Sequence, residues 1–152
     1  MLATTHVTTG AAMSFAFSPT YTGAIAAFVA GTASHLILDS VPHWGGVSDE
    51  AFIKVARVDG IALLTFSGMF LLLVVDSLTV GRAMTTAAAM FGALLFDLDK
   101  PVRHFFNVEL WPSKLAWFLS RIQREHHKLW PVDFTTGLTS ALIALYFTSF
   151  AG

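Results

Sequence analysis

Residues 58–75 read VDGIALLTFSGMFLLLVV, a run of eighteen residues with a single charged side chain. A transmembrane helix needs about 17–25 predominantly apolar residues, so this run predicts a helix that crosses a membrane. Three further apolar runs of similar length lie at 20–38, 80–96 and 134–151. We therefore expect an all-α integral membrane protein with four transmembrane helices.

The composition of the whole chain agrees with this fold class. Of its 152 residues, 55% are hydrophobic and 12% are charged, whereas a soluble domain carries about 25% charged residues. So few charges cannot cover the surface of a small protein, which excludes a monomeric water-soluble domain. The length predicts one domain over 1–152, and the composition makes it a helical domain embedded in a membrane, with membrane lipids as partners. Self-association and association with other membrane subunits are both possible. The net charge of −1 argues against a nucleic-acid partner.

Two shorter segments complete the expected fold. Residues 5–17 are apolar but too short to span a bilayer, and Pro19 follows them, so we expect a short helix folded back against the next one. Residues 113–129 predict an amphipathic helix that lies on the membrane surface or caps the bundle. Its apolar stripe follows i, i+3 and i+4 spacing and consists of Leu115, Phe118, Leu119, Ile122, His126 and Leu129.

The distribution of basic residues predicts an orientation. With these four spans, the loops at 39–57 and 97–133 lie on one side of the membrane and hold eight Lys and Arg residues, whereas the opposite loop holds only Arg82. The positive-inside rule places the basic side in the cytoplasm. We therefore expect a multi-pass protein of the inner cell membrane.

Rare polar residues gather at this cytoplasmic level. Ionisable side chains at the rim of a membrane bundle are costly and point to function, and several segments that bring His and Asp to one level predict a metal site. His35 and Asp39 are four residues apart and share one helix face. The candidate metal ligands are His6, His35, Asp39, Asp59, Asp97 and His126.

Each candidate also has a structural interpretation. Four of them could be helix-end residues that form hydrogen bonds with water and the backbone: His35, Asp39, Asp97 and Asp99. Asp59 could lie at a helix N-terminus because the helix dipole stabilises a negative charge there. His126 continues the apolar stripe, whereas His127 is turned about 100° away, so His126 is the expected ligand of the two. His43 could be a ligand or an exposed loop residue.

Three sequence motifs resemble those of the membrane-bound metal-dependent hydrolases of bacteria and archaea. They are Thr5-His6 followed by Thr-Gly-Ala-Ala, then Ser34-His35-Leu-Ile-Leu-Asp39 with Pro42-His43-Trp44, then Phe96-Asp97-Leu98-Asp99. Phe96 and Lys100 stand where the third motif of that family has proline and histidine. The resemblance implies a helical membrane protein that binds a divalent metal. It supports metal binding better than hydrolysis, because the hydrolase activity of that family is itself largely inferred.

These observations together predict a membrane-embedded metal-dependent hydrolase. Nitrogen and oxygen ligands with several carboxylates suit Zn best, with Mn or Fe as alternatives. Asp39 or Asp99 would act as the general base, and a site at headgroup depth predicts a lipid-like or amphiphilic ester as substrate. The alternative is a non-catalytic subunit of a larger membrane complex, in which the histidines are structural or ligate haem or a pigment.

Overall fold

The computed structural model describes residues 1–45, 48–77, 79–126 and 128–150. These residues are helical apart from their connections and one isolated β-bridge, between His43 and Glu125, which confirms the all-α class. The helices are α1 (Ala3–Ser14), α2 (Tyr21–Ser40), α3 (Asp49–Ser77), α4 (Val80–Leu94), the 3-10 turn η1 (Leu95–Leu98), α5 (Asp99–Phe106), α6 (Ser113–Ile122) and α7 (Trp130–Phe150).

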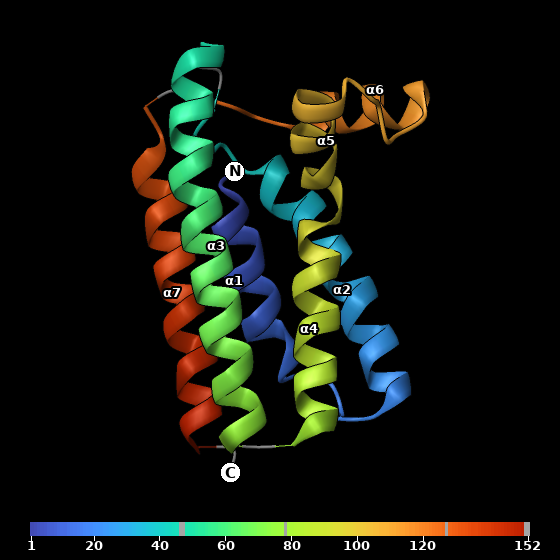
Figure 1. The fold of residues 1–152 in the computed structure, drawn as a ribbon, viewed down its shortest axis with the longest axis vertical. Coiled ribbons are helices and arrows are strands. Elements are labelled where there is room, and N and C mark those ends of the chain that lie inside the picture. The colour runs from blue at the N-terminus through green and yellow to red at the C-terminus, as the bar shows by residue number, and fades with distance from the viewer. Residues whose placement is uncertain (46–47, 78, 127, 151–152) are drawn as a thin grey trace.

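The shortest helix of the bundle lies at its centre. α1 contacts α2 as expected, but it packs more extensively against α4 and α7 and also touches α3 (Figure 1). Val7 and Ala11 of α1 join Phe70 and Val74 of α3 in the buried apolar core. The neighbouring helices therefore bury α1, and this burial explains how a helix too short to cross a bilayer fits into the protein.

The closest helix pair is α2 with α4, and glycine allows it. A Cβ atom on Gly31 would lie 2.2 Å from the carbonyl oxygen of Ala89, and one on Gly92 would lie 2.2 Å from the carbonyl oxygen of Phe28. In a membrane the hydrophobic effect does not drive helices together, and small residues allow close packing because the helix backbones can approach each other. Gly92 of α4 and Gly31 of α2 thus allow this close contact.

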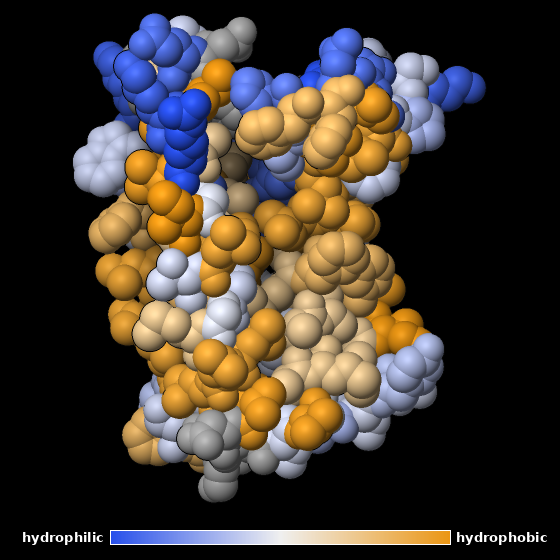
Figure 2. All heavy atoms as spheres, viewed as in Figure 1, coloured by the Kyte–Doolittle hydropathy of each residue, from blue (hydrophilic) through white to orange (hydrophobic). Residues whose placement is uncertain are grey.

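Two helices have the length and composition to cross a membrane. They are α2 and residues Ile53–Val75 of α3, and only 11% of the apolar window of α3 is buried in the protein. A core helix of a soluble protein would be mostly buried, so this helix presents its apolar side chains outward. Figure 2 shows a broad hydrophobic band over the middle of the bundle and hydrophilic side chains at the end where α5 and α6 lie.

The other two expected spans differ from α2 and α3. α4 ends at Leu94, so the helix is 15 residues long, or about 22 Å at 1.5 Å per residue. α7 has 21 residues, but threonines and serines dilute its apolar residues. By length and composition the described residues support two spans, and four remain a proposal.

The amphipathic segment is shorter than expected. α6 ends at Ile122 instead of continuing to residue 129, because Gln123 adopts an extended conformation. The backbone then pairs with the segment after α2: Arg124 N–H donates to the Asp39 carbonyl at 3.2 Å, and His43 N–H donates to the Arg124 carbonyl at 3.1 Å. This long-range pairing replaces the last helical turns. A second short helix, α5, precedes α6 and was not expected from the sequence.

Candidate metal centre

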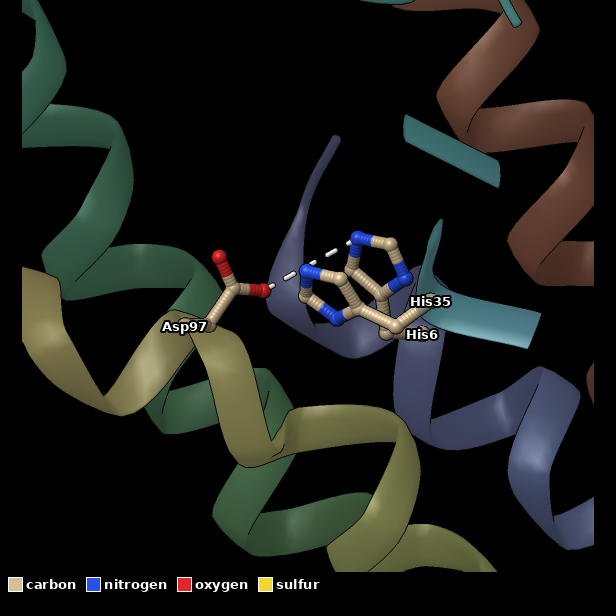
Figure 3. Close-up of side chains that lie close together, drawn as sticks. All are labelled: His6, His35 and Asp97. Carbon is tan, nitrogen blue, oxygen red and sulfur yellow. Dashed lines mark ion pairs between the residues drawn. The ribbon is translucent and has the colours of Figure 1, made fainter. Parts of the chain in front are cut away.

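Three distant segments bring donor atoms together at one end of the bundle. His6 from α1, His35 from α2 and Asp97 from η1 each offer a ligand atom, and these atoms all lie within 4.8 Å of one another. Figure 3 shows the two imidazoles stacked face to face, with the Asp97 carboxylate directed at them. The ring centroids are 3.9 Å apart, and all three side chains are buried.

Asp39 lies beside the stacked imidazoles, at the edge that carries their Nε2 atoms. Its Oδ1 is 3.2 Å from His6 Nε2, and its Oδ2 is 3.3 Å from His35 Nε2. Gln123 donates from Nε2 to Asp39 Oδ2 at 3.0 Å, and the amino group of Met1 lies 3.5 Å from Oδ1. Each oxygen of this buried carboxylate therefore faces a different imidazole.

The position of His35 follows from the α2–α4 contact. Gly31 precedes His35 by one turn, so the close helix approach at Gly31 brings His35 within reach of the α4 backbone. His35 Nδ1 lies 2.6 Å from the Ala93 carbonyl oxygen, which can only accept, so Nδ1 carries the proton. The Nε2 atom then points its lone pair toward Asp39, which is the arrangement found in metal-ligating histidines.

Asp97 is placed by a break between α4 and α5. Pro101 has no N–H to give to the Asp97 carbonyl, so a regular α-helix cannot run through this point, and the chain makes the 3-10 turn. Lys100 Nζ lies 2.8 Å from Asp97 Oδ1. This ion pair with the Lys100 ammonium favours the ionised form of the buried carboxyl group. Asp97 is therefore held as a carboxylate.

Several buried polar atoms in and beside this cluster have no hydrogen-bond partner among the described residues. Among the described residues, neither ring nitrogen of His6 makes a hydrogen bond of good geometry, and Asp97 Oδ2 and His43 Nε2 also have no partner. Leaving such groups unsatisfied costs about 1–3 kcal/mol each. A cation beside His6 Nε2 and Asp97 Oδ2, which lie 3.8 Å apart, would give both of these atoms a partner.

The spacing of the donors fits a metal ion. Ligand atoms bound about 2.0–2.1 Å from a tetrahedral Zn²⁺ lie about 3.3 Å from one another. The distances from His6 Nε2 to Asp39 Oδ1 and to Asp97 Oδ2 are 3.2 and 3.8 Å, and His35 Nε2 lies 3.3 Å from Asp39 Oδ2. His6, His35 and Asp97 are thus able to hold a divalent metal, with Asp39 beside them, and the donor set does not identify which metal.

Asp59 has a different role from the expected one. It lies inside α3 rather than at a helix N-terminus, and its carboxylate accepts from the backbone N–H groups of Ala3 at 2.7 Å and Thr4 at 3.2 Å. These N–H groups are the free donors at the start of α1, which a carboxylate stabilises. Asp59 therefore holds the helix that carries His6.

Asp99, the other expected base, is engaged outside the cluster. Arg103 donates to Oδ2, and the Leu110 N–H donates to Oδ1 at 2.8 Å. Burial favours a higher pKa for Asp99, but the hydrogen bonds from Arg103 and Leu110 outweigh it and lower the pKa. With these partners Asp99 fixes the turn between α5 and α6.

His126 does not lie on the helix that was expected to direct it inward. It follows the end of α6, its side chain is exposed, and Lys128 N–H donates to its Nδ1 at 3.3 Å. The apolar-stripe reasoning therefore does not apply to His126, because the stripe ends at Ile122. His127, its expected counterpart in water, lies outside the described residues.

Two buried residues were not chosen from the sequence. Asp133 in α7 is fully buried and accepts from the N–H groups of Leu2 at 3.0 Å and Trp44 at 3.2 Å, which joins α7 to both segments beside the cluster. His43 is also fully buried, and its Nε2 lies 4.0 Å from Asp39 Oδ1. Pro42 was the available signal for His43, since it ends α2 and turns the chain there.

Two surface hollows lie away from the cluster. Two open hollows of about 290 and 500 Å³ run along α7, and neither includes a candidate ligand. Their lining residues are Thr135, Thr136, Thr139, Ser140, Leu142, Ile143, Tyr146 and Phe147. The candidate site is therefore defined by its buried donors and not by a large cavity.

Comparisons with known proteins give no relative from which a role could be transferred. No family model matches the chain, and neither the curated proteins nor the solved structures contain a match.

Proposed function

We propose that this protein is a membrane-embedded metal-dependent hydrolase that acts on a lipid-like or amphiphilic ester. The observation that carries the proposal is the buried group of donors from His6, His35 and Asp97, in which His6 and Asp97 Oδ2 have no hydrogen-bond partner in the described part of the chain. Zn²⁺ suits these nitrogen and oxygen donors best, and Mn or Fe would also fit. The resemblance of the three motifs to membrane-bound metal-dependent hydrolases points the same way.

A bound divalent metal would supply Lewis acidity and lower the pKa of a water molecule at the site. The chain supplies the groups around it. Asp39 is the general base in this proposal, since its two oxygens lie 3.2 and 3.3 Å from the imidazole nitrogens of His6 and His35. Lys100 keeps Asp97 ionised.

The substrate class follows from the surface beside the cluster. α5 and α6 project from the same end of the bundle (Figure 1) and expose Phe105, Phe106 and Trp117. Arg103 and Arg121 on the same two helices are also exposed, so this arm combines apolar and cationic side chains. Such a surface suits the boundary between acyl chains and anionic headgroups, where an amphiphilic ester would be presented.

The membrane arrangement in this proposal has four spans. α4 and η1 together cover about 30 Å, with 1.5 Å per α-helical residue and about 2 Å per 3-10 residue, which equals the thickness of a hydrocarbon core. Reporter fusions test the orientation: one after Ser77 should report the extracytoplasmic side and one near Ser113 the cytoplasm. The reverse result for both would place the cluster on the other face.

The alternative of a haem or pigment subunit has less support from the site. His6 and His35 stack at 3.9 Å, which leaves no space for a planar macrocycle between them, and Asp39 contacts both rings. Axial ligation needs a histidine that faces an open apolar plane.

Hydrolysis by the purified chain tests the proposed function. Protein in lipid nanodiscs should hydrolyse a p-nitrophenyl acyl ester or a phospholipid, lose this activity on treatment with a chelator and regain it with Zn²⁺ or Mn²⁺. His35→Ala should be inactive, whereas His104→Ala, on the exposed face of α5, should retain activity. If the protein binds metal but hydrolyses no neutral lipid, phospholipid or simple ester, the proposed hydrolase activity is wrong and only the proposed metal site remains.

A further inference from the structure

We propose that His43 is an additional ligand of the metal centre, through Nε2, and that the metal thereby ties the chain after α2 to the bundle. This inference rests on the metal site in the proposed function, but not on hydrolysis. His43 belongs neither to the compact group of three donors nor to a helix, so its position needs its own explanation.

The hydrogen bond of the His43 ring sets its tautomer. Nδ1 lies 2.7 Å from the Val41 carbonyl oxygen, and a carbonyl only accepts, so the proton is on Nδ1. This leaves Nε2 as the atom available for a ligand, in the same way as the Ala93 carbonyl does for His35. Histidines that bind metals usually donate from the other ring nitrogen to such an oxygen.

The surroundings of Nε2 call for a cation. The side chain of His43 is fully buried, Nε2 has no hydrogen-bond partner among the described residues, and it lies 4.0 Å from Asp39 Oδ1. Asp39 Oδ1 is also the oxygen next to His6 Nε2. The imidazole nitrogens of His6 and His43 therefore approach one carboxylate oxygen. A positive ion bound among these three atoms would interact favourably with each of them.

The backbone fixes the position of the ring from both sides. Pro42 excludes a helical conformation for Val41, and His43 then pairs with the chain after α6. The His43 N–H donates to the Arg124 carbonyl at 3.1 Å, and the His43 carbonyl accepts from the His126 N–H at 2.7 Å. A ligand in this position would be preorganised by two backbone hydrogen bonds.

This geometry couples the metal to a long-range contact. His6 comes from α1, His35 and Asp39 come from α2, and Asp97 comes from η1. His43 would add the segment after α2, which pairs with residues 124–126. Binding of the metal should therefore hold this pairing closed. The metal would act on residues 124–126 through the backbone hydrogen bonds of His43, so these residues need not contact the ion.

Metal titration of the full chain tests this role. Wild-type protein in detergent micelles is stripped with a chelator and titrated with Co²⁺, whose visible absorption reports its ligands, and Zn²⁺ affinity is measured by competition. His43→Gln keeps the size and polarity of the ring but is a poor ligand, so it should weaken Zn²⁺ binding at least tenfold and change the Co²⁺ spectrum. His43→Cys should restore tight Zn²⁺ binding, since thiolate is a good ligand. His104→Gln is the matched control and should leave both readouts unchanged.

Amide hydrogen exchange supplies a second readout. Zn²⁺ should slow exchange at residues 124–126 in the wild type but not in His43→Gln. If His43→Gln is not recovered as monodisperse protein, the pair His43→Cys and His43→Ser gives the same comparison. Unchanged affinity and spectrum in His43→Gln, with loss of binding in His35→Ala, would overturn the role of His43 and leave the metal centre intact. Absence of binding in the wild type would overturn both.

Discussion

The two ends of the α1–α4 pair bury polar groups in opposite ways. At the end with His6, ring nitrogens and a carboxylate oxygen face one another without hydrogen bonds in the described residues. At the other end, the Ser14 hydroxyl donates to the Ala11 carbonyl at 2.7 Å and lies 2.9 Å from the Thr86 hydroxyl. Arg82 donates from one guanidinium nitrogen to the carbonyls of Ser14 and Phe17.

The difference shows what each end is built for. Both ends are buried, so both experience the same cost of unsatisfied polar atoms. The Ser14 end meets this cost with its own partners, which is typical of a structural contact. The His6 end leaves it unmet over several atoms at once, which is typical of a site completed by a ligand.

The largest expected effect compares one residue from each end of α1. His6→Ala removes a donor of the proposed site and should weaken Zn²⁺ binding about a hundredfold or more, since loss of supporting groups alone costs 10–100-fold. Ser14→Ala should lower stability but leave the affinity unchanged. Competition with a chromophoric chelator measures both. Equal affinities in the two variants would remove the distinction between the ends.

The next effect concerns the helix contact that positions His35. Gly31→Ala forces a Cβ atom against the Ala89 carbonyl and should lower the free energy of unfolding by about 1–3 kcal/mol. It should also weaken metal binding, because His35 lies one turn further along α2. Gly68→Ala on α3, where a Cβ meets nothing within 4 Å, is the control and should be neutral or slightly stabilising. Denaturant titration in micelles provides the comparison, and similar losses in both variants would mean that close approach is not the cause.

A smaller effect separates support of the site from ligation. Asp59→Ala removes the acceptor for the first N–H groups of α1 and should lower stability by about 0.5–2 kcal/mol, as expected for a lost N-cap. The metal affinity should fall much less than in His6→Ala. Glu50→Ala on the same helix, in an exposed ion pair with Lys54, should have no measurable effect. Loss of metal in Asp59→Ala as complete as in His6→Ala would return Asp59 to the ligand set.

The smallest effect is expected at Asp99. Arg103 is exposed to solvent, and an asparagine oxygen in place of the buried Asp99 carboxylate can still accept from the Leu110 N–H, so Asp99→Asn should lower stability at pH 7 by about 1 kcal/mol or less. Metal affinity should be unchanged, which thermal unfolding with and without Zn²⁺ would show. A strong loss of affinity would instead make Asp99 part of the centre.

Local sequence patterns predicted the residues that helices position directly. His35 and Asp39 lie one helical turn apart, and Asp97 follows an apolar run, so periodicity was enough to bring them to one level. The same reasoning placed His6 correctly, because the helix reversal after Ser14 returns the next helix alongside it. Four of the six expected ligands therefore lie in one buried cluster.

Residues placed by long-range pairing were not predictable in this way. The apolar stripe up to Ile122 gave no sign that the next residues pair with the backbone of Asp39 and His43, so the helix was extended too far and His126 was assigned to the wrong environment. Asp59 was expected at a helix start because the apolar run begins at Val58, whereas α3 already begins at Asp49. The burial of Asp133 depends on contacts more than 80 residues away.

The central position of α1 also has a consequence for biogenesis. Its twelve residues include four threonines and span about 18 Å, so lipid alone would hold it poorly during synthesis. Its main neighbours, α4 and α7, emerge from the ribosome much later. We therefore expect α1 to reach its buried position only after α4 and α7 have been synthesised, which would delay assembly of the His6, His35 and Asp97 cluster until then.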